Sequence, residues 1–186
     1  MYCTCNKGHN YQVVGLCDVA DLDVSGKKNW AQVIIPEVLY IPDCYPDIEN
    51  IEKIYITVEI TKSMVIETPS SIKDANGDSL IDGMNNEGAI ATGRKLIVSG
   101  KLCQTIVYTA DVCVQSLHSV NFEYPFCEYI VLPEDVDLDQ NFCVEACVED
   151  VYAKVLTPKT IFKSVTLFLL AEKLVPSCLP LSSSDN

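Results

Sequence analysis

Apolar and polar residues alternate along much of this chain with the period of two that is typical of half-buried β-strands. The clearest run extends from Ile54 to Ile60, where every second residue is Ile or Val. Other runs of β-branched and aromatic residues lie at 96–98, 104–108, 122–132, 143–156 and 161–170. Clusters of Gly, Pro, Asn and Asp separate the runs, as turn residues do. The pattern predicts an all-β fold, either an antiparallel β-sandwich or a barrel-like sheet.

The order of these elements occurs twice. Residues 39–43 (LYIPD) precede an acidic loop, a strand-like run ending at Pro69 and the run GRKLIVSGKL, whereas residues 130–134 (IVLPE) precede an acidic loop, a run ending at Pro158 and IFKSVTLFLL. The matching prolines are offset by 133 − 42 = 91 and 158 − 69 = 89 residues. This near-constant offset predicts two duplicated β units, at about 39–110 and 130–175, packed around a pseudo-twofold axis. Chance similarity between two β segments is the alternative.

A length of 186 residues suits one domain with a substantial core. We expect an N-terminal cysteine-containing arm and first strand over residues 1–31, a β domain over residues 32–175, and a small, polar, flexible C-terminal tail over residues 176–186.

The charge excludes two kinds of partner. With 13 basic and 26 acidic residues the formal charge is −13, which nucleic acid and anionic membranes would both repel. The most apolar stretch, residues 165–171, is far shorter than the ~20 residues of a membrane span. The first ten residues contain no apolar segment that resembles a secretory signal. We therefore expect synthesis in the cytosol without a signal peptide, and neither nucleic acid nor membrane as partner.

Residues suited to catalysis are scarce. The chain has two histidines, His9 and His118, and histidine is the commonest general base near neutral pH. A dyad of His118 with Cys113 or Cys127 can be drawn, but no nucleophile elbow or protease-type cysteine signature accompanies it. The sequence therefore predicts a non-enzymatic protein without a cofactor.

Metal-binding patterns are equally incomplete. The sequence DANGD at 74–78 places polar residues as a calcium loop does, but Asn85 stands where the closing Glu belongs, and Asn-Gly favours a turn. A zinc site can be drawn from Cys3, Cys5, His9 and Cys17. Its spacing is irregular and the chain has no CxxC motif, so we predict no metal site.

Ten cysteines, about 5% of the chain, are too few for a disulfide scaffold and many for a cytosolic protein. One group falls on the arm, turns and tail: Cys3, Cys5, Cys17, Cys44 and Cys178. Because thiols on exposed segments can reach a neighbouring molecule, we expect these to form intermolecular disulfides. For Cys3 and Cys5, a free or metal-binding pair is the alternative. The second group lies on or beside predicted strands, where internal disulfides or buried thiols are expected: Cys103, Cys113, Cys127, Cys143 and Cys147.

Several segments also resemble a known family. They are VIIPEVLYIPDCYPDIENI, VEITKSMVIETP, GRKLIVSGKLCQTIVYTAD, QSLHSVNFEYPFCEYIVLPED and VEDVYAKVLTPKTIFKSVTLFLLAE. In this order, from about Val33 to Val175, they resemble the SPOCS domain of anaerobic spore-forming bacteria, a family associated with spore coat and exosporium proteins. Many relatives carry an added LysM module, which this sequence lacks. Its dense cysteines are similar to those of cysteine-rich clostridial exosporium proteins that self-assemble.

The resemblance implies a structural protein of the spore surface, in the exosporium, the coat or an appendage, made in the mother-cell cytosol. Its expected partners are copies of itself, in a lattice or filament cross-linked by disulfides after that cell lyses, and other spore coat or exosporium proteins. Two alternatives remain open. One is a coat-assembly adaptor that recruits another spore morphogenetic protein, and the other is a cytosolic metal-binding or redox protein.

Overall fold

The computed structural model describes residues 10–18, 20, 22, 26, 29–69 and 92–174. These residues contain seven strands and no α-helix: β1 (Gln12–Val14), β2 (Trp30–Tyr40), β3 (Ile48–Glu67), β4 (Arg94–Ala110), β5 (Leu117–Val131), β6 (Phe142–Thr157) and β7 (Thr160–Lys173). The all-β prediction is confirmed. The predicted tail at 176–186 and the first nine residues of the predicted arm lie outside the described residues.

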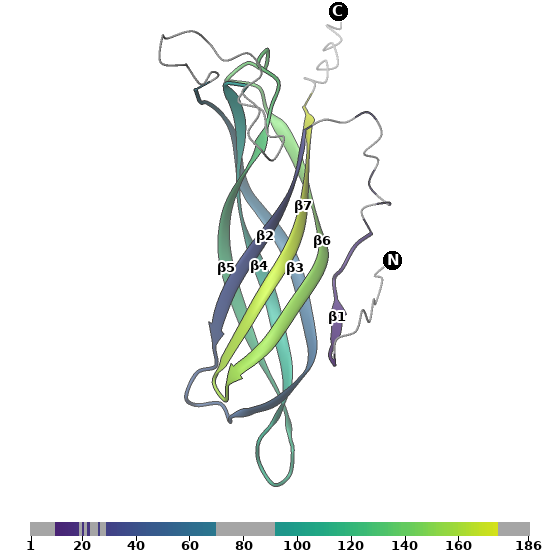
Figure 1. Cartoon of the computed structure of the whole chain (residues 1–186), viewed down its shortest axis with the longest axis vertical. Coiled ribbons are helices and arrows are strands. Elements are labelled where there is room, and N and C mark those ends of the chain that lie inside the picture. Colours follow the sequence, from purple (N-terminus) through teal and green to yellow (C-terminus); the bar gives the residue numbers. More distant parts are fainter. Residues whose placement is uncertain are drawn as a thin grey trace, which may run out of the picture.

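The strands form two sheets that pack face to face as a sandwich (Figure 1). One sheet has the order β1-β3-β4-β5 and the other has the order β2-β7-β6. All pairings are antiparallel except that β1 runs parallel to β3. The sandwich is therefore the correct one of the two predicted architectures, and the sheets do not close into a barrel.

The strand order has an internal symmetry. Exchanging β2 with β5, β3 with β6 and β4 with β7 converts the order β5-β4-β3 into β2-β7-β6. The exchanged strands also contact each other across the sandwich, β3 against β6 and β2 against β5. The strands therefore form two sets, β2–β4 and β5–β7. In each set the first strand lies in one sheet and the other two lie in the opposite sheet. This is the arrangement that a pseudo-twofold axis requires, and the duplication itself stays a prediction.

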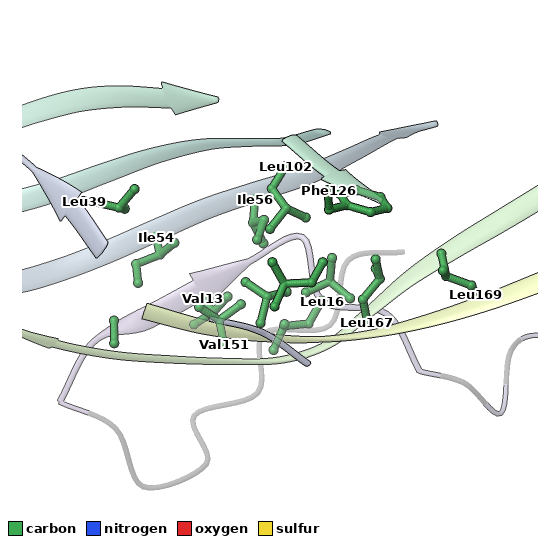
Figure 2. Close-up of a cluster of buried hydrophobic side chains, with 14 of the residues drawn as sticks. Val13, Leu16, Leu39, Ile54, Ile56, Leu102, Phe126, Val151, Leu167 and Leu169 are labelled. Atoms are coloured by element: carbon green, nitrogen blue, oxygen red, sulfur yellow. The ribbon is translucent and has the colours of Figure 1, made fainter. Parts of the chain in front are cut away.

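The core lies between the sheets, where the alternating positions of the strands meet. In β4, every second residue from Leu96 to Ala110 is buried. Ile54 and Leu102 from one sheet face Val151 and Leu167 from the other (Figure 2). Burying a side chain of this size stabilises the fold by about 1.5–3 kcal/mol. Strand alternation in the sequence therefore placed the core correctly.

Residues 11–17 close the side of the sandwich between β3 and β6. The Tyr11 hydroxyl donates to the Val151 carbonyl (3.2 Å) and accepts from the Ala153 amide (2.6 Å). Gly15 has a φ of +112°, and a Cβ there would lie 1.9 Å from the Ile56 carbonyl oxygen, so only glycine fits. This segment covers a sheet edge that would otherwise expose apolar side chains.

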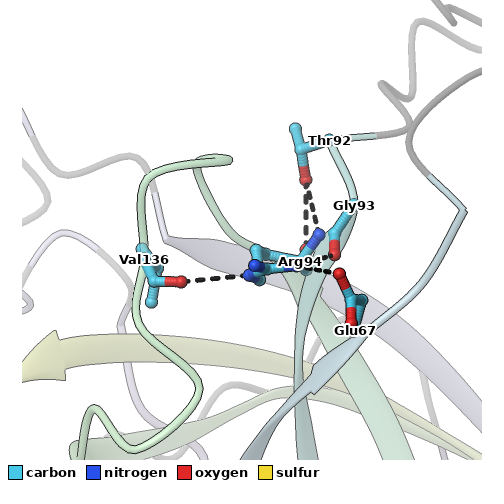
Figure 3. A network of polar contacts seen from close by, with 5 residues as sticks. All are labelled: Glu67, Thr92, Gly93, Arg94 and Val136. Carbon is cyan, nitrogen blue, oxygen red and sulfur yellow. Dashed lines mark hydrogen bonds and ion pairs between the residues drawn. The ribbon is translucent and has the colours of Figure 1, made fainter.

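The single arginine of the sequence has a structural role (Figure 3). Arg94 begins β4, and its guanidinium contacts Glu67 at the end of β3 (3.1 Å) and the Val136 carbonyl oxygen in the β5–β6 connection (3.1 Å). It therefore ties together three segments at the end of the sandwich where β3 ends.

Candidate assembly surface

Three connections meet at the opposite end of the sandwich, the lower end in Figure 1. They are residues 41–47 between β2 and β3, residues 111–116 between β4 and β5, and residues 158–159 between β6 and β7. We call this region the turn end. Backbone bonds join the connections: the Ile41 amide donates to the Lys159 carbonyl (2.8 Å), and the Asp111 amide donates to the Asp47 carbonyl (2.9 Å). Lys159 also forms an ion pair with Asp47 (3.1 Å). Backbone hydrogen bonds and an ion pair thus hold the three connections of the turn end together.

The turn end exposes both thiols and apolar side chains. Cys44 and Cys113 are free and exposed, one on each of the two longer connections. Val112 and Val114 flank Cys113, and the Val114 side chain is 85% exposed. Near the end of this connection, Gln115 has a φ of 45°, and its side-chain amide donates to the Glu49 carboxylate (2.9 Å). Reactive thiols beside exposed apolar groups are suited to contact with another molecule.

The outer face of the three-stranded sheet also exposes several large apolar side chains. The outward positions of β2 include Ile34 (67% exposed), Val38 and Tyr40 (69% exposed). Tyr152 of β6 lies on the same face and packs edge-on against Phe162 of β7, with 6.3 Å between the ring centroids. A polar outer face is the norm for a sheet that faces water, so this face resembles a surface that another molecule covers.

The structure contradicts the prediction that Cys17 forms an intermolecular disulfide. This residue was expected among the intermolecular cysteines, but the structure bonds it to Cys147 within the same chain. The Cys17 amide also donates to the Val148 carbonyl (3.0 Å), which fixes the N-terminal segment along β6. The two residues are 130 positions apart, so no local pattern could have revealed the pair. For Cys147, an internal disulfide was one of the predicted outcomes.

Four other strand-associated cysteines also differ from their prediction. Cys113, Cys127 and Cys143 are free and exposed, and Cys103 is free and half-buried, so none of them is bridged or fully buried. The physical reason is phase: Cys103, Cys127 and Cys143 occupy outward positions of their strands, and Cys113 lies in a connection. Cys44 is free and exposed, as its placement in a turn predicts.

Several predicted residues lie outside the described part of the chain: Cys3, Cys5, His9, Cys178 and the turn at 74–78. His118 lies within it, where its Nε2 is 2.9 Å from the Ser116 hydroxyl and its ring stacks on Tyr108 at 5.8 Å. Within the described ranges no group of three His, Cys, Asp or Glu side chains could hold a metal ion. Nor does any helix in those ranges have the length and apolar character needed to cross a membrane.

The core contains a polar cluster that the sequence analysis did not single out. Glu37 of β2 and Lys163 of β7 are directly paired in register and form an ion pair in which both side chains are 0% exposed. Gln104 of β4, on the facing sheet, donates from Nε2 to Glu37 Oε2 (2.7 Å). Burial lowers the pKa of Lys163, and the Glu37 carboxylate partly opposes that shift. The sequence does contain one sign of this cluster. Glu37 alternates with Ile35 and Leu39, so its charged side chain points to the same buried face of β2 as theirs.

The symmetry-related position does not repeat this cluster. Glu128 of β5 follows Glu37 by 128 − 37 = 91 residues, the same offset as the first pair of prolines. Its register neighbour on β4 is Val98, not a lysine, and partial burial raises the pKa of its carboxyl group. The Glu–Lys–Gln cluster combines residues from both sets of strands, and the symmetry-related Glu128 position does not repeat it.

One comparison with known proteins is informative. Residues 47–156 match the family model described as SipL, SPOCS domain. This range runs from the start of β3 almost to the end of β6 and covers more than half of the chain. No curated protein and no solved structure matches the chain.

Proposed function

Because this chain belongs to the SPOCS-domain family and is a sporulation-related protein, we propose that it is a structural protein of the spore surface. In this proposal, copies assemble into a lattice or filament of the exosporium, coat or an appendage. Intermolecular disulfides then lock the assembly once the surroundings become oxidising. The protein is made in the mother-cell cytosol, where its thiols stay reduced.

The observation that carries this proposal is the turn end. Cys44 and Cys113 are exposed thiols on connections that direct bonds hold in place, with the 85% exposed Val114 beside them. Apolar contact between copies would bring the thiols together before oxidation joins them. Cys3, Cys5 and Cys178 remain predicted cross-linking residues, and Cys17 is withdrawn from that group because Cys147 occupies its sulfur.

The apolar outer face of the three-stranded sheet supports repeated contact between copies. It lies along the length of the sandwich, whereas the turn end lies at one tip (Figure 1). When one such surface contacts a different surface of the next copy, the contact does not close on itself and a filament or lattice results. A surface that only bound itself would stop at a dimer.

The test uses protein expressed alone, viewed by electron microscopy and then boiled for a denaturing gel with and without reductant. We expect ordered assemblies and a ladder of covalent multimers that reductant collapses to monomer. The variant C44S/C113S should weaken the ladder, whereas C103S, at a half-buried thiol, is the matched control and should leave it unchanged. A ladder that is absent, or indifferent to reductant, contradicts covalent cross-linking.

The alternative is an adaptor that binds another spore morphogenetic protein through the same apolar face. An adaptor would remain a monomer or dimer by light scattering at every concentration and would show no ordered arrays. Stoichiometric zinc in the purified protein would instead revive the metal-binding alternative. These outcomes separate the three functions in one preparation.

A further inference from the structure

The buried cluster of Glu37, Gln104 and Lys163 holds a set of groups that can react with one another. Lys163 supplies a primary amine, Gln104 a carboxamide, and Glu37 a carboxylate that contacts both. The residues are 0–4% exposed, so water is excluded from all three. The Gln104 amide must direct Nε2 toward Glu37, because a carboxylate can only accept hydrogen bonds.

We propose that Lys163 Nζ attacks the side-chain carbonyl carbon Cδ of Gln104 and forms an intramolecular amide cross-link between the two sheets. Lys163 lies on β7, the central strand of the three-stranded sheet, and Gln104 lies on β4 in the facing sheet. The bond would therefore join the two layers of the sandwich covalently, in a way that neither reductant nor denaturant reverses.

The dimensions of the sandwich suit this bond. Packed sheets lie about 10 Å apart, a lysine side chain extends about 6 Å from Cα to Nζ, and a glutamine side chain extends about 4 Å from Cα to Cδ. The two side chains together therefore span the gap. The Glu37 carboxylate contacts both side chains: Oε1 pairs with Lys163 Nζ, and Oε2 accepts from Gln104 Nε2. The two oxygens of one carboxylate are close neighbours, so Glu37 holds both reacting side chains next to one carboxylate group.

The step balances without an oxidant or co-reactant. Glu37 takes one proton from the Lys163 ammonium, which frees the nitrogen lone pair to attack Cδ. Glu37 then passes that proton to Nε2 of Gln104 and takes a second proton from Nζ. The Cδ–Nε2 bond breaks and ammonia leaves. The products are an Nζ–Cδ amide, ammonia and a neutral Glu37 carboxylic acid, so no charge remains in the core.

Burial favours both the reaction and its product. A desolvated lysine is more readily deprotonated, and the pKa of Lys163 is lowered for this reason. Before reaction, Gln104 Oε1 and Lys163 Nζ have no hydrogen-bond partner in the described structure beyond the ion pair with Glu37. The reaction replaces two buried charges with neutral groups and removes several donors that lack acceptors, which relieves the cost of burying them.

The test is the intact mass of folded, reduced wild-type protein. We expect a loss of about 17 Da, the mass of ammonia released when an amine displaces an amide nitrogen. Tryptic digestion should join the peptide of residues 102–154 to that of residues 160–173, because trypsin does not cleave after an acylated Lys163. Full mass in the folded protein, with separate peptides ending at Lys154 and Lys163, would overturn the proposal.

Two variants exclude other sources of the mass loss. The Asn76-Gly77 pair can also release ammonia by forming a succinimide, and that reaction would persist in K163R. We expect K163R, which keeps the positive charge beside Glu37, to lack the loss of ammonia seen in the wild type, and an equal loss in K163R refutes the assignment. E37Q retains both reacting groups but lacks the proton carrier, so it should retain its full mass when circular dichroism shows that it is folded. If either variant does not fold, the wild-type mass and peptide map decide alone.

Discussion

Replacing Cys17 by alanine tests the disulfide that distinguishes the structure from the sequence-based expectation. Cys17 and Cys147 are 130 residues apart, so their bond restricts the unfolded chain over most of its length. The loop-entropy relation gives about 5 kcal/mol for a loop of this size, as an upper value. That is a large fraction of the ~5–15 kcal/mol that stabilises a typical domain.

The structure adds a local contribution. Cys147 lies in a small buried cluster with Phe168 and Leu170, against which Cys17 and Leu22 pack. This cluster is on the outer side of the three-stranded sheet, where Trp30 also stacks on Phe168 with 5.5 Å between the ring centroids. Without the disulfide, the N-terminal segment is retained only by noncovalent contacts such as those of Tyr11. Its amides should therefore exchange faster in the variant.

The assay is unfolding in guanidinium chloride of the wild type and C17A, each with and without reductant. We expect oxidised wild type to exceed C17A by about 3–5 kcal/mol, and reductant to remove most of that difference. Equal stability of oxidised wild type and C17A would refute the internal pairing. A peptide map that links Cys17 to another molecule would refute it as well, and C17A would then weaken the ladder of multimers.

The remaining predictions concern the N-terminal segment. G15A should lose at least about 2–3 kcal/mol, because Gly15 has a φ of +112° and a Cβ would lie 1.9 Å from the Ile56 carbonyl. G26A is the matched control, since Gly26 also has a positive φ (+72°) but open space around it, and it should cost about 1 kcal/mol in thermal unfolding. Equal losses would contradict the steric explanation. Y11F removes the acceptor of the buried Ala153 amide and should cost about 1–3 kcal/mol in chemical denaturation. Desolvation raises the pKa of Tyr11 above 10.0, so its contribution is complete below pH 10.0 and is lost as the pH rises through the folded-state value. Stability of the wild type should therefore fall more steeply than that of Y11F as the pH rises above 10.0, and parallel pH profiles would refute this assignment.

The fold was predictable because its main determinant is local. A strand with one face in the core must bury every second side chain, and the alternation from Ile54 to Ile60 records this directly. The repeated order of elements, with offsets of 91 and 89 residues, is consistent with the symmetric strand order of the two sheets, and the duplication stays a prediction. Both signals depend on spacing along the chain.

The pairing of the cysteines and the polar contacts in the core depend on residues that are far apart in the sequence, so residue spacing could not predict them. Cys17 meets Cys147 across 130 residues, and Lys163 meets Glu37 and Gln104 from three strands in two sheets. A shift of one residue in phase turns a strand side chain from the core to solvent, which is why Cys103, Cys127 and Cys143 carry free thiols on outward positions. The sequence alone indicated most of the strands, although its predicted runs did not include β2 (Trp30–Tyr40). Only the tertiary structure decided which thiols are paired, which face solvent, and which polar groups share the core, because register and sheet packing fix those neighbours.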